Sequence, residues 1–263
     1  MTSRRLAAVV LLALAVSSRS DLHAQGAAAC SKAWLGKEAE IEAFLASAKV
    51  TRLEAVPTGV TKPQRGYLEP GPVARFAWKQ LPPARRAGYM ESYKAEIAAY
   101  QLDRLLEMQM VPPVVERTVE GKIGAAVLWI EDTRSWDMKK PVQGPEPGWS
   151  KQISRMKLFD QLIGNIDRNQ GNLIYDTDWH LFLIDHSRAF TTRKSLDGIA
   201  PLVTIDAELW QRIEALTAAD LDRALGAWLT ADQQEALFAR REKMQQAVAK
   251  LVKDKGAASV FLR

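Results

Sequence analysis

The first half of the chain switches between helix-like and strand-like spacing of its apolar residues. Residues 37–49 (KEAEIEAFLASAK) place apolar side chains at helical spacing, which predicts a short amphipathic helix. In residues 51–82, turn residues separate short apolar stretches, and VARFAWK (73–79) alternates between two faces. This pattern predicts a hairpin or small sheet.

A longer helix and a pair of strands follow. SYKAEIAAYQLDRLLEM (92–108) places its apolar residues on one stripe, and Ser92 is positioned as the N-cap. VPPVV ends this helix because proline cannot continue it. Residues 117–132 then predict two strands around Gly121.

The second half of the chain is mainly helical. A stretch rich in proline and glycine, 141–149, predicts a loop or linker, and residues 154–165 predict a helix. NLIYD and LFLID within 172–185 predict a strand pair. Residues 206–252 are predicted to be helical. The residues at capping-box spacing are Thr217 with Asp220 and Thr230 with Gln233.

This order of elements predicts an α+β fold with two lobes, a small β-rich lobe and a mainly helical one, and a crevice between them. The length of 263 residues suits such a unit. We place the boundaries by composition. They are an export segment at 1–29, an N-terminal helix at 30–50, the β-rich lobe at 51–132, a linker at 133–150 and the helical lobe at 151–263.

The N-terminus has the order of an export signal. MTSRR carries two arginines, an uncharged apolar run follows from Leu6 to Val16, and polar and then small residues come next. At about 11 residues the run is shorter than the roughly 20 of a transmembrane helix, so we expect export to the periplasm or medium rather than a membrane anchor. A lipid on Cys30, the only cysteine, is an alternative that would bring the protein close to a membrane.

Charge adds little to this. The net charge is +5, and the basic residues are spread along the chain rather than gathered in one segment. No nucleic-acid partner is expected from such a pattern.

Two polar stretches carry the chemistry. GNIDRNQGN (164–172) contains Asp167 and, five residues later, Asn172, and LIDHSRAF (183–190) contains Asp185. A loop aspartate, an asparagine and a further aspartate are the side chains that phosphoryl transfer uses to orient a hydroxyl and hold a divalent metal against nucleotide phosphates. Hard oxygen ligands of this kind suit Mg²⁺. Turn-capping roles for the two aspartates are the structural alternative.

This interpretation predicts partners upstream. Lys79 closes the strand pattern VARFAWK, and Glu96 lies in the first turn of the predicted helix. The two would pair, and the lysine would neutralise phosphate charge. GAAVLWIED then supplies a strand whose backbone could meet adenine at about Leu128–Glu131.

The chain resembles the atypical kinases of the phosphatidylinositol 3-/4-kinase-like and Golgi secretory-kinase (four-jointed) superfamily. The residues that carry the resemblance are EIAAYQLDRLLEMQMVPPVV (96–115), LFDQLIGNIDRNQGNLI (158–174) and LIDHSRAF (183–190). The chain lacks the disulfides and insertions of the Golgi members, so it resembles a minimal, bacterial version. It also departs from relatives in having His-Ser after the metal aspartate, where Asn-Gly is frequent.

The resemblance implies a kinase-like fold, ATP as co-substrate and Mg²⁺ or Mn²⁺ as cofactor. It implies that Asp167 is the catalytic aspartate, that Asn172 and Asp185 bind metal, and that Lys79 and Glu96 form the nucleotide ion pair. Further nucleotide-binding candidates are Gly59, Thr61, Leu128, Trp129 and Ile130, and candidates for phosphate or acceptor contacts are Arg168 and Arg188, with salt bridges inside the loop as the alternative.

Four functions remain open at this stage. The first is an ATP-dependent kinase acting on a hydroxyl of a protein, sugar or lipid. The second is a transferase that moves AMP on the same fold. The third is an ATP-binding pseudokinase scaffold, and the fourth is an exported protein whose motifs arise by chance. The acceptor stays unknown because acceptor surfaces in such folds are variable loops.

Overall fold

The computed structural model describes residues 32–56, 63–136 and 142–263. The predicted export signal at 1–29, Cys30, and the phosphate-loop candidates Gly59 and Thr61 lie outside the described residues. Among the helices that the model describes, none combines the length and the apolar character needed to cross a membrane.

An antiparallel five-stranded sheet forms the smaller lobe. Its strands lie in the order β1-β2-β3-β7-β6. Their bounds are β1 Val50–Ala55, β2 Gln64–Leu68, β3 Arg75–Lys79, β6 Val114–Val119 and β7 Lys122–Leu128. Helix α1 (Glu38–Ser47) packs against β6 and β7. Phe76 and Trp78, which the alternation in β3 assigns to one face, are almost completely buried in the core of this lobe.

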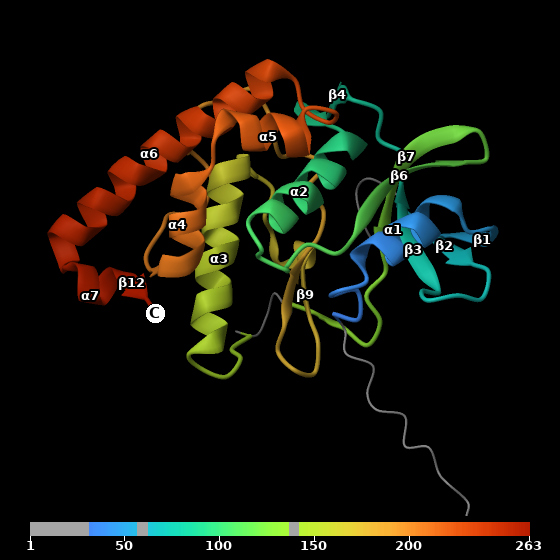
Figure 1. The fold of residues 1–263 in the computed structure, drawn as a ribbon, viewed down its shortest axis with the longest axis horizontal. Coiled ribbons are helices and arrows are strands. Elements are labelled where there is room, and N and C mark those ends of the chain that lie inside the picture. Colours follow the sequence, from blue (N-terminus) through green and yellow to red (C-terminus); the bar gives the residue numbers. More distant parts are fainter. Residues whose placement is uncertain (1–31, 57–62, 137–141) are drawn as a thin grey trace, which may run out of the picture. The chain divides into compact units, whose positions relative to one another are not determined.

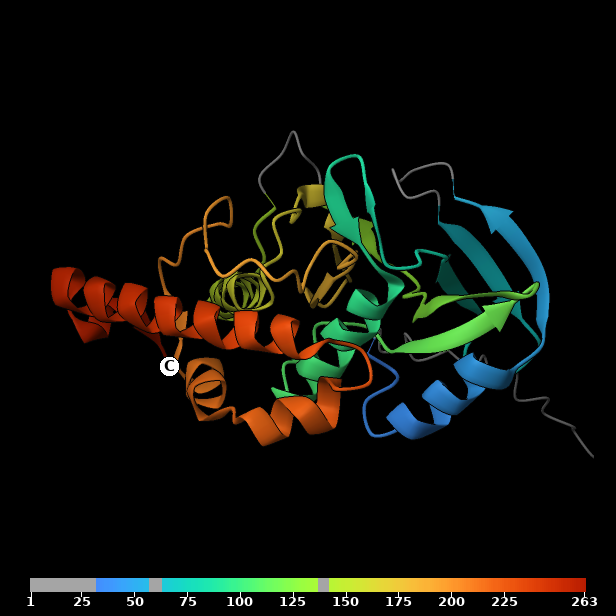
Figure 2. The same ribbon diagram turned by 90° about the horizontal axis from the view of Figure 1, so that it is seen from above.

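Helix α2 (Tyr93–Leu105) connects the two lobes. Ser92 is its N-cap, and the Ser92 side chain accepts a hydrogen bond from the Lys94 N–H, as the sequence predicts. A short hairpin of β4 (Ala84–Arg86) and β5 (Tyr89–Glu91) separates β3 from this helix. Figures 1 and 2 show α2 between the sheet and the helices that follow α2 in the chain. Its apolar stripe belongs to the larger hydrophobic core, together with residues of α3 (Gly148–Ile163) and β10 (Leu181–Leu183).

The larger lobe is helical. It contains α3 (Gly148–Ile163), α4 (Ala207–Ala215), α5 (Ala218–Leu225), α6 (Ala231–Lys255) and α7 (Ala257–Val260). Both predicted capping boxes form, at the N-termini of α5 and α6. The short strands are β8 Arg134–Ser135, β9 Leu173–Tyr175, β10 Leu181–Leu183, β11 Ile205–Asp206 and β12 Phe261–Leu262, and Gln170–Asn172 form a 3₁₀ turn. The hairpin of β9 and β10 is the predicted strand pair.

Helix α3 begins at Gly148, six residues before the predicted start, so the predicted loop at 141–149 is shorter than expected. The physical reason is tertiary packing. Trp149 in the first turn is buried, stacks on Trp136 at 5.5 Å between ring centroids, and meets Trp179 edge-on at 5.8 Å. These aromatic contacts from distant segments stabilise a helical turn that local sequence does not favour.

Candidate active site

Three charged residues from separate elements meet at the junction of the two lobes. Lys79 ends β3, Glu96 lies in the first turn of α2, and Asp185 follows β10. The Lys79 Nζ donates to Glu96 Oε1 at 2.6 Å and to Asp185 Oδ1 at 3.0 Å. The structure therefore joins the lysine to the glutamate that its spacing predicts, and adds the aspartate from a segment 106 residues away.

Burial strengthens the electrostatic interaction of Lys79 with the two carboxylates. Lys79 and Glu96 are almost fully inaccessible, whereas the Asp185 side chain is 28% exposed. Burial alone would lower the pKa of Lys79, but the carboxylates of Asp185 and Glu96 outweigh it and raise that pKa above its ordinary value. Burial would likewise raise the pKa of Glu96, and Lys79 outweighs it, so this pKa lies well below its usual range. Lys79 and Glu96 are therefore both charged at neutral pH.

Neighbours hold the two carboxylates in place. The backbone N–H of His186 donates to Glu96 Oε2 at 3.0 Å, and the Ser187 hydroxyl donates to Asp185 Oδ1 at 3.1 Å. Asp185 has a φ of 61°, in the left-handed region that is uncommon for residues other than glycine. A strained residue that carries a partly exposed carboxylate is a recurrent feature of functional sites.

Asp167 lies in the loop after α3. The helix ends at Gly164, which has a φ of 70° and allows the chain to turn away from the helix axis. The Asp167 backbone N–H donates to Asn165 Oδ1 at 3.1 Å, and its carbonyl accepts from Asn172 Nδ2 at 3.0 Å and from Asn169 Nδ2 at 3.1 Å. Its carboxylate is 36% exposed. The amides of the loop thus fix the backbone and leave the carboxylate accessible.

Arg168 makes its contacts within the protein. Its guanidinium donates twice to Asp160, to the carbonyls of Asn172 and Ile184, and to His186 Nε2, all within 3.2 Å. These contacts use all five of its N–H donors. Arg168 is therefore an internal brace of the loop, in line with the salt-bridge alternative, and its contact with a phosphate or acceptor stays a prediction.

Arg188 connects the loop to the β4–β5 hairpin. Its Nη1 donates to Asp167 Oδ2 at 3.1 Å, and its Nε donates to Glu91 Oε1 at 2.9 Å. The guanidinium also lies over the Tyr89 ring, 4.4 Å from the centroid. This ion-pair partner, Glu91, was not predicted from the sequence, because a pair between separate elements has no local signature. Arg188 keeps contact with Asp167 and stays a candidate for an acceptor contact.

Asn172 and Asp185 carry oxygen atoms that could hold a divalent metal. The N–H of Ile184 donates to the Asn172 carbonyl at 3.2 Å, which places the two candidate ligands on neighbouring segments. The Asn172 Nδ2 is engaged with Asp167, so its Oδ1 is the atom available to a metal. Asp185 Oδ1 accepts from Lys79 and Ser187, and Oδ2 is the other ligand atom. One amide and one carboxylate oxygen fit Mg²⁺ or Mn²⁺ when phosphate oxygens complete the coordination.

A second group of ligand types lies in the turn between β9 and β10. Ligand atoms of Asp176, Asp178 and His180 all lie within 4.8 Å of one another. Hydrogen bonds inside the turn account for this spacing, since Asp176 accepts from the N–H groups of Asp178 and His180 and contacts His180 Nδ1 at 2.7 Å.

The predicted adenine segment ends β7. The N–H of Leu128 donates to the Pro113 carbonyl at 2.8 Å, and that of Trp129 donates to the Arg75 carbonyl at 3.1 Å. These two N–H groups are engaged within the protein, which narrows the prediction of an adenine contact through backbone N–H to Ile130 and Glu131. The Trp129 ring is half-buried beneath the guanidinium of Arg65, 4.1 Å from the ring centroid.

No family model and no curated protein matches the sequence. Solved structures match the fold. The Golgi casein kinase with Mn/ADP bound gives a TM-score of 0.66 at 14% identity, covering 86% of this chain and 79% of that one. Hydra Fam20 with sugar gives 0.62 at 20% identity, covering 86% and 92%. The Helicobacter pylori proinflammatory kinase CtkA gives 0.50 at 11% identity, covering 80% and 98%. The chain therefore has an atypical, Fam20-like kinase fold with two lobes.

Proposed function

We propose that this protein is an ATP- and metal-dependent phosphotransferase that moves the γ-phosphate of ATP to a hydroxyl group. The observation that carries the proposal is the contact of Lys79 with both Glu96 and Asp185 at the junction of the lobes. Burying a lysine with two carboxylates carries a desolvation cost. A role in neutralising nucleotide phosphate charge would explain why the protein keeps such a group.

Each polar residue then has a role in the transfer. The acceptor oxygen attacks the γ-phosphorus, a new P–O bond forms, the bond to the β–γ bridging oxygen breaks, and ADP leaves. The proton of the acceptor hydroxyl passes to the Asp167 carboxylate, which is accessible and is held by the amides of its loop. Lys79 neutralises phosphate charge, and Glu96 holds the lysine in position.

Asn172 and Asp185 are the residues that would hold the divalent ion. When bound, the ion would neutralise charge on the phosphate oxygens. Ser187 and Lys79 both donate to Asp185 Oδ1 and so fix the orientation of the Asp185 carboxylate toward the ion.

The test uses the purified protein with Mg²⁺ or Mn²⁺ and ATP labelled at either the α- or the γ-phosphate, with cell extract as the source of acceptors. We expect γ-label in an acceptor. Asp167→Asn and Asp185→Asn should reduce transfer by about 10²-fold or more, because each removes a group that acts in the transition state. Asp222→Asn, an exposed aspartate of α5, is the matched control and should transfer normally.

Other outcomes decide between the remaining functions. Transfer of the α-label would replace the kinase by a nucleotidyl transferase. Metal-dependent stabilisation by ATP without any transfer, lost in Asp185→Asn, would point to a pseudokinase scaffold. Absence of both transfer and ATP binding would overturn the proposal and leave the fold alone.

Two narrower points belong to the same proposal. The motifs around Glu96, Asp167 and Asp185 support a compact bacterial member of the phosphatidylinositol 3-/4-kinase-like superfamily. The order of charge, apolar run and small residues at the N-terminus supports export. Cell fractionation, with sequencing of the mature N-terminus, tests export: an uncleaved protein in the cytoplasm would contradict it.

A further inference from the structure

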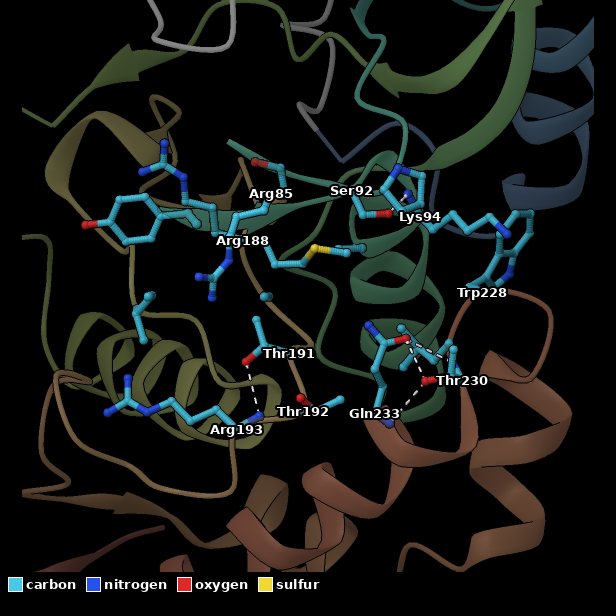
Figure 3. A pocket seen from close by; sticks show the side chains of 18 of the residues that line it. Arg85, Ser92, Lys94, Arg188, Thr191, Thr192, Arg193, Trp228, Thr230 and Gln233 are labelled. Atoms are coloured by element: carbon cyan, nitrogen blue, oxygen red, sulfur yellow. Dashed lines mark hydrogen bonds between the residues drawn. The ribbon is translucent and has the colours of Figure 1, made fainter. Parts of the chain in front are cut away.

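A large cavity lies beside the candidate active site. Its volume is about 940 Å³. Five segments line it: the β4–β5 hairpin, the N-terminus of α2, Ile166 in the loop after α3, residues 187–193 after Asp185, and the connection from α5 to α6. Figure 3 shows their side chains arranged around this cavity. A space of this size holds a molecule rather than a single ion, since ligand pockets span roughly 300–1,000 Å³.

The charge of the cavity wall has one sign. Arg85, Lys94, Arg188 and Arg193 line it, and none of the described residues that line it is an aspartate or glutamate. Arg188 is engaged by Asp167 and Glu91, and Arg193 lies 3.7 Å from Asp197. By contrast, Arg85 and Lys94 make no ion pair with any residue that the structure describes. Arg85 is exposed and Lys94 is half-buried, so both cations are available to a ligand in the cavity.

Two helix N-termini add to the positive electrostatic potential of the cavity. Ser92, the N-cap of α2, and Thr230, the N-cap of α6, both line the cavity. The positive ends of a 13-residue and a 25-residue helix thus lie at the same space. Cations and helix dipoles of the same sign, without acidic residues in the wall, favour a negatively charged ligand.

The cavity adjoins the carboxylate that accepts the proton. Ile166, the neighbour of Asp167, lines it, and the lining residue Arg188 lies 3.1 Å from Asp167 Oδ2. Part of the wall is apolar and open to the ligand, since Tyr89 and Met90 are 42% and 41% exposed. A ligand in this cavity can therefore present a hydroxyl to Asp167 while its charged group reaches Arg85 and Lys94.

We propose that this cavity is the acceptor site, and that the acceptor is a small hydroxylated molecule with an anionic group such as a phosphate or carboxylate. The inference rests on the proposed function, which it deepens by naming the acceptor class.

The first experiment measures binding without catalysis. Inorganic phosphate is titrated into the full protein saturated with Mn²⁺ and a non-hydrolysable ATP analogue, so that the triphosphate positions of the nucleotide site are filled. We expect phosphate to bind, and its dissociation constant to rise about tenfold or more in Arg85→Gln/Lys94→Gln, because two charged hydrogen-bond donors are lost. Lys122→Gln/Arg134→Gln, at two exposed cations outside the cavity, is the control and should bind as the unmodified protein does. Equal affinity in the cavity variant, or no binding at all, would overturn the proposal.

The second experiment measures transfer. γ-Labelled ATP is offered with glucose, glucose 6-phosphate, glucuronate or a serine-containing acidic peptide. We expect label in the anionic sugars and a raised acceptor KM, with unchanged ATP KM, in Arg85→Gln/Lys94→Gln. The proposed acceptor class would be overturned if the anionic sugars stayed unlabelled while glucose, the peptide or the protein itself took up the label. The kinase activity would still stand in that case. Binding of phosphate in the first experiment, with no transfer from ATP to any acceptor or to water, would instead contradict the proposed function.

Discussion

The Nζ of Lys79 lies 2.6 Å from Oε1 of Glu96, and both side chains are almost completely buried. Removing one partner leaves the other as an uncompensated charge in a poorly solvated site. We expect Lys79→Met to lower the free energy of unfolding by about 3–5 kcal/mol, as measured by urea denaturation. Glu96→Gln should cost less, because Asp185 still pairs with the lysine.

A double-mutant cycle measures the interaction energy between Lys79 and Glu96 apart from their contacts with other residues. Lys79→Met/Glu96→Gln should cost less than the sum of the single changes, because neither charge is then left alone. The exposed pair of Lys194 and Glu235 is the matched comparison, and Lys194→Met should cost less than about 1 kcal/mol. Equal costs for Lys79→Met and Lys194→Met would contradict the role of burial.

His186 should make the protein sensitive to acid. It is buried against Glu96, Arg168 and Asp160, and burial lowers its pKa below the ordinary value of 6.5. Between pH 7 and pH 5 the unfolded chain therefore binds a proton at this residue that the folded protein excludes. The free energy of unfolding should fall over this range as pH falls. We expect His186→Gln, which keeps an acceptor for Arg168, to reduce this loss.

His180 is the control for that measurement. It lies in the β9–β10 turn beside Asp176, and its side chain is 36% exposed, whereas His186 is buried. His180→Gln should leave the acid-dependent loss of stability in place. If instead the loss persists unchanged in His186→Gln, its origin lies in another group and the assignment to His186 is wrong.

Local signals account for the parts of the fold that the sequence predicts well. The capping boxes at Thr217 and Thr230 each involve residues three apart, and both form. The start of α3 was misplaced because Trp149 is held by Trp136 and Trp179, which come from other segments. Packing across the fold overrides local propensity at such positions.

Local motifs likewise identify some residues of the site, whereas packing of distant segments determines others. Lys79, Glu96 and Asp185 could be chosen in advance because each belongs to a motif with an expected spacing. Arg168 could not be assigned from its motif, because a phosphate contact and a salt bridge need the same residue type. The cavity cations Arg85 and Lys94 belong to no motif, and their proximity depends on how the β4–β5 hairpin packs beside α2.

Arg168 should not tolerate replacement by lysine. The guanidinium serves Asp160, two backbone carbonyls and His186 at once, and a lysine offers three donors on one nitrogen. We expect Arg168→Lys to cost about 2–3 kcal/mol, because buried acceptors are left unsatisfied. The exposed Arg134 is the control, since Arg134→Lys should change stability by no more than about 0.5 kcal/mol. Equal urea midpoints for the two variants would contradict the bracing role.

Alanine substitutions at Gly164 and Gly198 distinguish the cost of backbone strain from the cost of steric crowding. Both have left-handed φ values, of 70° and 78°, so an alanine at either position costs about 1–2 kcal/mol. A Cβ at Gly198 meets nothing within 4 Å, whereas one at Gly164 lies 3.0 Å from Cζ of Arg240. That guanidinium is completely buried and donates to the carbonyls of Leu162 and Arg193, so it has little room to move.

We therefore expect Gly164→Ala to destabilise the protein more than Gly198→Ala does, by about 1 kcal/mol or more, because the added methyl group overpacks a closed site. Thermal unfolding of the two variants side by side checks the difference. Because Arg240 holds the end of α3 next to the Asp167 loop, Gly164→Ala should also lower γ-phosphate transfer, and Gly198→Ala should not. Equal melting temperatures for the two variants would show that the Arg240 side chain yields, and that it does not hold the end of α3 in a fixed position.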